Sequence, residues 1–324
     1  MKYINKILTS ILIWTSFLLC SCGKDEIPLS YGTLENDPNY VIEVKSEQLS
    51  SDFFAKDLCA IAQDKTDTSS IDPTIINAAG VYALDDVSVL YSYQANERVN
   101  PASLTKLMTA LLVFENCNLN DMVTVGDVKI SEEGAQLFNL KEGDLISVRD
   151  LLYITLIHSG NDAALALAIY VAGSEEAFVD MMNERALELG ATNTHFENPH
   201  GLTSENHYTT AYDLYLIFNS DIQYPEFQTI INTTTYTVNY AHSNGEAVSK
   251  DISSTNKYLT NVYDSPDIVT IVGGKTGSTS AAGKCLIIYA TSVSGKPYIC
   301  VIMGAGDEDT LYHYMTRLCN EVCN

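Results

Sequence analysis

The spacing of apolar residues predicts strands near the start of the chain, followed by a buried helix. Apolar runs at residues 77–84 and 87–93 are typical of strands, and Asp85–Asp86 between them is typical of a tight turn. At Asn100–Pro101 the pattern changes to a helix, with Asn as the N-cap and Pro at the first helical position. Residues 104–114 are nearly all apolar, which predicts that this helix is buried on most sides.

Helix signals dominate the middle of the chain. Capping residues and apolar periodicity predict helices at residues 147–157, 162–171, 174–190 and 211–218. Residues 158–161 separate the first two of these helices, so polar side chains from this break can project into a cleft.

The C-terminal part of the chain returns to strand patterns. Predicted strands lie at residues 233–240, 247–252, 268–273, 285–292 and 297–303, and a closing helix covers 311–322. Because strands occur at both ends with helices between them, we expect a mixed α/β (α+β) fold. Its single sheet would be mainly antiparallel, built from N- and C-terminal strands and covered by helices.

Composition and charge exclude several classes of protein. Of the 324 residues, 46% are hydrophobic and 18% are charged, which argues against disorder and against a polytopic membrane protein. There are 18 Lys and Arg against 41 Asp and Glu, so the formal net charge is -23. A charge of this sign repels phosphate backbones, and we expect no nucleic acid partner.

The N-terminal residues are typical of an export signal. Lysines precede an apolar run at residues 7–19, and we predict that residues 1–21 are a signal peptide. Residues 19–22 resemble the lipobox of bacterial lipoproteins, which implies lipid attachment at Cys22. The protein would then be extracytoplasmic and anchored in the bacterial cell membrane through this lipid. Cleavage without lipidation is the alternative.

The remaining chain divides into a tether and one domain. Residues 22–45 are polar and acidic, which is typical of a tether between a lipid and a folded body. A helical pattern within residues 46–61 predicts a short amphipathic helix that docks on the domain. Residues 46–324 are expected to form a single domain, with no additional C-terminal domain.

The spacing of cysteines and histidines indicates neither a disulfide framework nor a metal site. Six cysteines follow Cys22: Cys59, Cys117, Cys285, Cys300, Cys319 and Cys323. Cys319 and Cys323 lie four residues apart on a predicted helix, which fits poorly with a bridge. We interpret most of the cysteines as small apolar core residues, and we expect no metal and no other cofactor.

The first candidate for chemistry is the tetrad Ser103–Lys106. Ser103 and Lys106 lie three residues apart and share one helix face. The first turn of a helix also has free N–H groups that can stabilise an oxyanion. The same Ser-x-x-Lys pattern occurs at Ser21 and Ser254, so alone it is not specific. In the alternative interpretation, Lys106 only extends past the edge of the core into water.

The second candidate is Ser159–Gly160–Asn161, which occupies the break between two apolar helices. A hydroxyl and an amide at this break could face a cleft. Ser-x-Asn also occurs at Ser204 and Ser254, and Asn161 could simply cap the following helix.

The third candidate is Lys275–Thr276–Gly277–Ser278, which follows a strand pattern ending in two glycines. Lys275 supplies a second positive charge, and Gly277 would allow a substrate backbone to approach closely. As a lone triplet, Lys-Thr-Gly could also be an ordinary turn at the end of a strand.

In this order and context, the three motifs resemble those of the active-site serine penicillin-recognising enzymes. Within that group, roughly residues 76–303 look most similar to the serine-type D-Ala-D-Ala carboxypeptidases, which are low-molecular-mass penicillin-binding proteins. The resemblance implies a β-lactamase/transpeptidase-like fold with a helical subdomain. It also implies a hydrolase that removes the terminal D-Ala from peptidoglycan stem peptides through an acyl-serine intermediate, and that binds β-lactams.

The resemblance implies a role for each helical motif residue. Ser103 would be the nucleophile. Lys106 would take its proton, and burial and repulsion from Lys275 would keep Lys106 neutral. Ser159 would pass a proton to the departing amine, and Asn161 would hold the substrate amide and orient Lys106.

The strand motif would bind the substrate. The resemblance implies an oxyanion hole formed by the N–H groups of Ser103 and Ser278. Thr276 and Ser278, beside Lys275, would bind the terminal carboxylate. Some relatives add an arginine near the last helix for this carboxylate, but residues 304–314 contain none and Arg317 lies further along.

Two other functions remain open. A class A-like β-lactamase usually has Ser-Asp-Asn where this chain has Ser159–Gly160–Asn161. It also has a downstream loop Glu, whereas Glu175 and Glu176 fall at a helix start. A non-catalytic penicillin- or muropeptide-binding lipoprotein is the second alternative, although a binder needs no deprotonated lysine. His200 lies in a loop that the family uses structurally, and we do not expect it to be the base.

Overall fold

A computed structural model of the protein describes residues 57–67 and 69–323. The predicted signal peptide 1–21, Cys22 and the tether 22–45 lie outside the described residues. So does most of the predicted helix within 46–61, and its described end, residues 57–61, has no helix.

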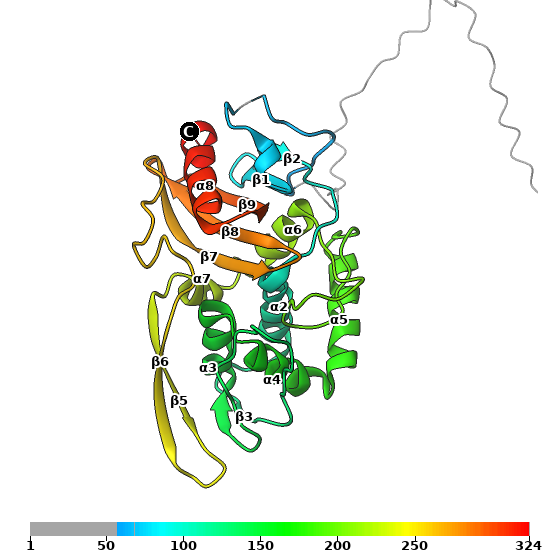
Figure 1. The fold of residues 1–324 in the computed structure, drawn as a ribbon, viewed down its shortest axis with the longest axis vertical. Helices are drawn as coiled ribbons and strands as arrows, with labels where there is room; N and C mark the ends of the chain where they lie inside the picture. Colours follow the sequence, from blue (N-terminus) through cyan, green and yellow to red (C-terminus); the bar gives the residue numbers. More distant parts are fainter. Residues whose placement is uncertain (1–56, 68, 324) are drawn as a thin grey trace, which may run out of the picture. The chain divides into compact units, whose positions relative to one another are not determined.

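Five strands form the central antiparallel sheet, in the order β2-β1-β9-β8-β7 (Figure 1). They are β1 Ala78–Ala83, β2 Ser88–Tyr93, β7 Val269–Thr279, β8 Gly283–Ser292 and β9 Pro297–Ala305. The first hairpin lies against the last strand of the chain, since Ala78 of β1 is opposite Met303 of β9. The predicted antiparallel sheet built from both ends of the chain is therefore confirmed.

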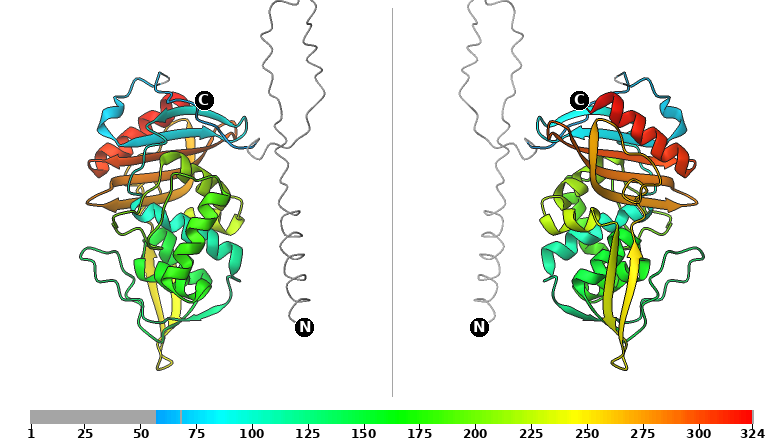
Figure 2. Two further views of the ribbon diagram at one scale, coloured as in Figure 1. Left: turned by 90° about the vertical axis from the view of Figure 1, so that its right-hand side faces the viewer. Right: turned by 90° about the vertical axis from the view of Figure 1, so that its left-hand side faces the viewer.

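Both faces of this sheet are buried, which explains why its strands have nearly continuous apolar sequences. On β9, Tyr298, Cys300 and Ile302 belong to the core beneath α8 (Glu308–Val322). The alternate residues Ile299 and Val301 belong to the core shared with the other helices. Figure 2 shows this layering, with α8 on one face of the sheet and the remaining helices on the other.

The helices lie mainly between β2 and β7 in the chain. They are α2 Lys106–Asn116, α3 Val148–Tyr153, α4 Asn161–Ala172, α5 Glu175–Glu188, α6 Ala211–Asp221 and α7 Pro225–Ile231. The described residues also contain two 3₁₀ turns, η1 Pro73–Ile75 and η2 Ala102–Thr105, and one π-helical turn, η3 Ile154–His158. No helix in residues 57–67 or 69–323 combines the length and hydropathy needed to cross a bilayer.

The helix ends follow the capping residues. Ser147 and Ser174 accept hydrogen bonds from backbone N–H groups in the first turns of α3 and α5. Gly173 ends α4 in the left-handed conformation, with φ of 84°. Asn100 accepts from the N–H of Ala102, as expected of a cap, but the first turn that follows is 3₁₀ rather than α.

The prediction of a single sheet is wrong, because a second sheet of four strands is present. Its order is β3-β4-β5-β6, and its strands are β3 Met122–Thr124, β4 Leu145–Ser147, β5 Thr235–Ala241 and β6 Ala247–Ser253. The predicted hairpin at 233–240 and 247–252 forms, but it belongs to this second sheet. β3 and β4 have three residues each, which is too short for an alternating pattern to be recognised.

Candidate active site

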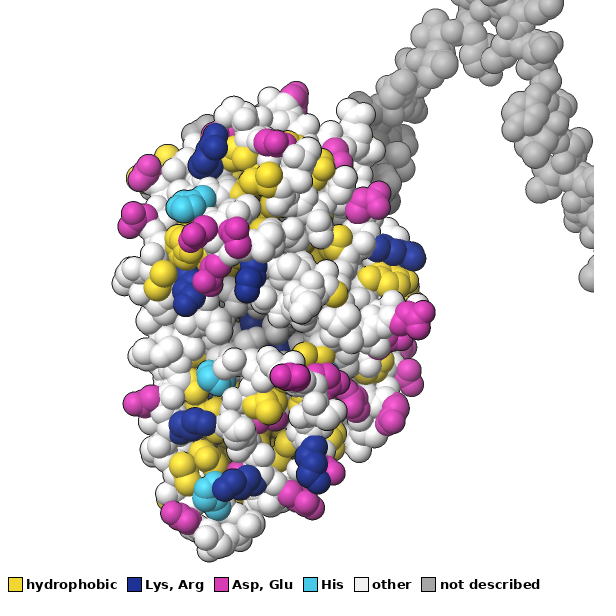
Figure 3. Space-filling view, in the orientation of Figure 1, with side chains coloured by type: hydrophobic (Ala, Val, Ile, Leu, Met, Phe, Trp, Pro, Cys, Tyr) yellow, Lys and Arg dark blue, Asp and Glu magenta, His cyan; other side chains and the backbone are white. Residues whose placement is uncertain are grey.

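One cavity of about 540 Å³ brings the three sequence motifs together. It is lined by Ser103 from η2, Ser159 from the break before α4, Asn161 at the start of α4, and Thr276–Ser278 from β7. Figure 3 shows a hollow in the middle of this face, with basic side chains visible inside it. Residues that are far apart in the sequence thus surround a single space that a ligand can enter.

Lys106 contacts Ser103, the candidate nucleophile. Its Nζ lies 3.0 Å from Ser103 Oγ, 2.6 Å from Asn161 Oδ1 and 2.6 Å from the carbonyl oxygen of His200. A neutral amine has two hydrogens and one lone pair. The two acceptors, Asn161 and His200, use both hydrogens, so the lone pair is left for the Ser103 hydroxyl proton.

The surroundings of Lys106 disfavour its charged form. The side chain is fully buried, and burial is the largest cause that lowers its pKa well below the usual value. The charge of Lys275 lowers it further, while Asp162 opposes both effects. Burial also lowers the pKa of Lys275, to about 7. Because Lys106 feels the repulsion of Lys275 in addition to burial, we conclude that Lys106 loses its proton first.

Ser159 is held in an unusual backbone conformation that directs it to Lys275. Its φ is 65°, in the left-handed region, which costs about 1–2 kcal/mol for a residue with a side chain. It ends the π-helical turn η3, where its N–H donates to the carbonyl of Ile154. Its Oγ accepts a hydrogen bond of 2.9 Å from Lys275 Nζ. Strain of this kind is often found at functional sites.

Gly277 lets β7 approach the segment that carries Ser103. A Cβ at Gly277 would lie 3.0 Å from the carbonyl oxygen of Pro101 and 3.2 Å from the backbone nitrogen of Ser103. The sequence interpretation assigned this glycine to a close approach of substrate, and Gly277 lines the cavity; the structure adds that the protein's own backbone approaches it as well. β7 is also the edge strand of the sheet, so one of its sides is free of a neighbouring strand.

The polar side chains after Lys275 face the cavity from β7 and β8. Thr276 Oγ1 lies 2.6 Å from Thr255 Oγ1, and Ser278 Oγ accepts a hydrogen bond of 3.0 Å from Lys284 Nζ. The sequence analysis did not identify Lys284. The feature that could have identified it is the β7–β8 hairpin, because its register places Lys284 opposite Ser278.

The loop at residues 198–202 supports the site through its backbone. Gly201 has φ of +86°, and a Cβ there would lie 1.9 Å from the carbonyl oxygen of Ala102. This tight contact places the His200 carbonyl against Lys106. The His200 imidazole is buried, which is the main reason why its pKa falls to about 3, and it is therefore neutral near pH 7. His200 thus contributes an acceptor rather than a base.

Comparison with known proteins shows what this chain is related to. Residues 69–307 match the family model described as D-alanyl-D-alanine carboxypeptidase. The chain belongs to this family. It is 37% identical over 228 residues to D-alanyl-D-alanine carboxypeptidase DacF of Bacillus subtilis (strain 168), covering 68% of this chain and 55% of that protein. It is 36% identical over 241 residues to DacC of Escherichia coli (strain K12), covering 71% and 56%.

The chain thus spans little more than half the length of these two carboxypeptidases. It covers 85% of the D-alanyl-D-alanine carboxypeptidase of Streptomyces sp. (strain K15), with 32% identity over 254 residues. The crystal structure of the Streptomyces K15 DD-transpeptidase superposes with a TM-score of 0.70 at 28% identity, covering 76% of this chain and 96% of that one. The D-alanyl-D-alanine carboxypeptidase from Mycobacterium tuberculosis H37Rv gives 0.67 at 28% identity, covering 76% and 90%. The predicted fold class is confirmed.

Two charged residues considered in the sequence analysis lie outside the cavity. Arg317 pairs with Glu321, at 3.8 Å, along α8 and is not among the described residues that line the cavity. Glu175 lies 3.8 Å from His200 Nε2 and also does not line it. The one carboxylate among the described lining residues is Glu308, at the start of α8.

The cysteines differ from the sequence interpretation in one place. Cys59 and Cys285 are buried free thiols in the core, as expected. Cys300, Cys319 and Cys323 are also buried, but their three sulfur atoms gather in one cluster. Sequence spacing could not show this, because Cys300 comes from a strand, whereas Cys319 comes from α8 and Cys323 from its C-cap.

Proposed function

We propose that this protein is a serine-type D-alanyl-D-alanine carboxypeptidase that releases the terminal D-Ala of peptidoglycan stem peptides. The observation that carries the proposal is the contact of Lys106 Nζ with Ser103 Oγ at 3.0 Å, with both amine hydrogens used elsewhere. Family membership and the names of the relatives support the same reaction. β-Lactams would acylate the same serine.

In the acylation step, Ser103 Oγ attacks the carbonyl carbon of the penultimate D-Ala. The hydroxyl proton moves to Lys106 Nζ as the C–O bond forms. The N–H groups of Ser103 and Ser278 would hold the negative oxygen, since η2 and β7 lie in contact at Gly277.

The peptide C–N bond then breaks, and Ser159 passes its proton to the departing D-Ala amine and takes up the proton that Lys106 received, so that Lys106 is neutral again. Lys275 donates a hydrogen bond to Ser159 Oγ and would stabilise it as its proton leaves. In deacylation a water molecule adds to the acyl-serine and gives a proton to Lys106, which passes it to Ser103 Oγ as the ester C–O bond breaks. Ser103 is regenerated, and the shortened peptide leaves as a carboxylate.

The substrate would bind along β7. An extended peptide can add to the free edge of this strand by backbone hydrogen bonds. Its terminal carboxylate would lie near Thr276 and Ser278, with Lys275 beneath them. We add Lys284 to this group, because its ammonium already contacts Ser278 Oγ within the cavity and supplies the positive charge that Arg317 cannot bring there.

The test of Lys284 uses a diacyl tripeptide that ends in D-Ala-D-Ala. Lys284→Met should raise KM about tenfold with a smaller change in kcat, because carboxylate binding and not proton transfer is lost. Lys296→Met, at an exposed lysine of the turn between β8 and β9, is the control. An unchanged KM in the Lys284 variant would exclude this role.

The test of the reaction compares Ser103→Ala with Ser254→Ala. Both serines begin a Ser-x-x-Lys pattern and both line the cavity. Only the Ser103 variant should lose labelling by a fluorescent penicillin and release of D-Ala. Labelling that survives in Ser103→Ala would reject the proposed nucleophile.

The same assays separate the alternative functions. A class A-like β-lactamase would hydrolyse penicillin rapidly without peptide turnover. A non-catalytic penicillin- or muropeptide-binding lipoprotein would bind peptide equally well with and without the Ser103 hydroxyl. The pair of lysines around Ser103 and Ser159 favours the carboxypeptidase over the binder.

We also propose that the protein is exported, loses residues 1–21 and is anchored to the membrane by a lipid on Cys22. Residues 22–45 would be the tether, and residues 46–324 the catalytic domain. The sequence pattern at residues 7–22 supports this. Mass spectrometry of the mature protein tests it, because an unmodified Cys22 or an intact N-terminus would contradict it. The same spectrum after penicillin treatment identifies the acylated serine.

A further inference from the structure

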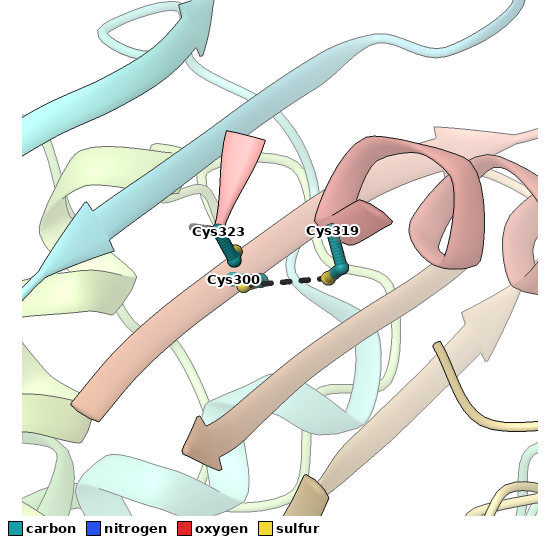
Figure 4. Close-up of side chains that lie close together, drawn as sticks. All are labelled: Cys300, Cys319 and Cys323. Atoms are coloured by element: carbon teal, nitrogen blue, oxygen red, sulfur yellow. Dashed lines mark hydrogen bonds between the residues drawn. The ribbon is translucent and has the colours of Figure 1, made fainter. Parts of the chain in front are cut away.

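Three buried thiols gather at the end of α8 (Figure 4), and none of them lines the cavity with the motifs described above. Cys300 comes from β9, and Cys319 and Cys323 come from α8 and its C-cap. The Sγ atoms of all three lie within 4.8 Å of one another, and those of Cys300 and Cys319 are 3.7 Å apart. All three residues have no exposed surface.

The fold explains why these thiols meet. Cys300 lies on the face of β9 that packs beneath α8. Cys319 and Cys323 are four residues apart, so one helix face presents both of them to the sheet. The cluster therefore links the central sheet to its covering helix.

The geometry fits one shared ion better than a disulfide bond. In a tetrahedral thiolate site with metal–sulfur distances of about 2.3 Å, the sulfur atoms lie about 3.8 Å apart. The Sγ atoms of Cys300 and Cys319 are 3.7 Å apart and no pair in the cluster is more than 4.8 Å apart, so small rotations of the side chains would complete the site. A disulfide bond would join only two of the sulfurs and leave the third thiol unpaired.

We propose that Cys300, Cys319 and Cys323 bind one thiophilic cation of the Zn²⁺ or Cu⁺ type. Soft thiolate ligands select these ions. Cys323 also borders a surface cavity of about 430 Å³ with Asp267, Ser292 and Ser294, which gives the ion a route from solvent and gives Zn²⁺ space for a fourth, water ligand. Three thiolates alone would suffice for Cu⁺.

The ion would fasten the last turn of α8 to β9. Each ligand has to lose its proton, so binding releases protons and strengthens as the pH rises. The site is independent of the proposed peptidase reaction, because none of its three residues lines the cavity with Ser103.

The test uses the full chain, reduced, freed of metal and kept without oxygen. Zn²⁺ alone and Cu⁺ alone are added, and native mass spectrometry counts the ions bound. We expect one ion per chain and a rise in Tm of roughly 5–10 °C at a hundredfold excess over Kd. Cys300→Ser and Cys319→Ser should each lose both effects, whereas Cys59→Ser, at a buried free thiol of the other core, should keep them.

Binding of neither ion, or equal binding by the Cys300 and Cys59 variants, would overturn the proposal. So would a disulfide between two of the three cysteines in protein isolated without reductant, if it persists when either ion is supplied. If the serine variants do not fold, X-ray absorption of the loaded wild type decides, because three sulfur ligands are expected and fewer would exclude the site.

Discussion

At the scale of single residues, the two buried lysines define the chemistry of the site. The sequence allowed both causes of a neutral Lys106 to be anticipated, namely burial in an apolar helix and repulsion from Lys275. It could not show that Asp162 opposes them, because that carboxylate is fixed by the N–H groups of residues 138–140 in a distant loop. It could not show the His200 carbonyl either, because a backbone acceptor has no signature in the sequence.

The first prediction concerns the pH dependence of acylation. The rate should rise as Lys106 loses its proton, and it should do so far below the pH at which an ordinary lysine titrates, because its pKa is well below the usual lysine value. It should fall again as Lys275 loses its charge around its pKa of about 7. Stopped-flow acylation by a fluorescent penicillin from about pH 5 to about pH 10 measures this profile. A rate that keeps rising into the ordinary range of lysine would contradict the neutral Lys106.

The second prediction concerns a carboxyl group outside the site. Asp221 is fully buried, neither of its oxygens has a hydrogen-bond partner, and burial raises its pKa well above the usual value. Because the folded form keeps the proton that the unfolded form releases, Asp221 reduces stability as the pH rises above about 4. Asp221→Asn should therefore stabilise the protein at pH 7 by about 1–3 kcal/mol.

Denaturant unfolding at two pH values measures this effect. The gain from Asp221→Asn should be smaller at about pH 4, where the unfolded Asp221 is itself partly protonated. A variant that is less stable than the wild type at pH 7 would show that the native carboxylate has favourable interactions.

At the scale of elements, the sequence predicted those whose ends carry capping residues. Ser147, Gly173 and Ser174 cap helix ends through interactions with residues close to them in the sequence, so the sequence alone can predict these ends. β4 depends instead on pairing with β5, which follows about 90 residues later, and β3 pairs only with β4, so nothing near them specifies a strand. The 3₁₀ turn η2 likewise depends on contacts from β7 and from Gly201.

The third prediction tests the contact between Gly201 and η2. Gly201→Ala should be strongly destabilising and should slow acylation of Ser103 at least tenfold, because its methyl group would clash with the Ala102 carbonyl. Gly245→Ala is the matched control. Gly245 has a similar φ of +85°, but a Cβ there meets nothing within 4 Å.

The control variant should lose only about 1–2 kcal/mol of stability from the left-handed backbone and keep its acylation rate. Equal acylation rates in the two variants would show that the position of Ser103 does not depend on the loop at residues 198–202. Circular dichroism melts and penicillin labelling provide both measurements.

At the scale of the whole molecule, the predicted arrangement of strands from both ends explains how the site is assembled. β7 carries Lys275 to the helical segments that present Ser103 and Ser159, and the sheet can do this because β1 pairs with β9 and so joins early and late strands of the described chain. The motif order in the sequence was therefore informative about the site. The depth at which the two lysines are buried was not, since it results from packing of the complete domain.

The fourth prediction is that this burial has a measurable cost in stability. Lys275 has a pKa of about 7 when folded, whereas an unfolded lysine titrates near about 10.4. Below pH 7 both states carry the proton, and the folded state bears the full cost of the buried charge. Between these two values the unfolded state binds more protons, so the contribution of Lys275 to stability improves as the pH rises.

Lys275→Met should therefore be inactive and yet more stable than the wild type at pH 6–7, by roughly 2–4 kcal/mol. The difference between the two proteins should shrink as the pH approaches 10, whereas exposed Lys296→Met should match the wild type throughout. Calorimetric melts at several pH values measure this difference directly. A Met variant that is less stable at pH 7 would mean that the hydrogen bonds from Lys275 to Ser159 and to the Thr276 carbonyl outweigh the desolvation of its charge. The lowering of the Lys275 pKa would then be less than its burial implies.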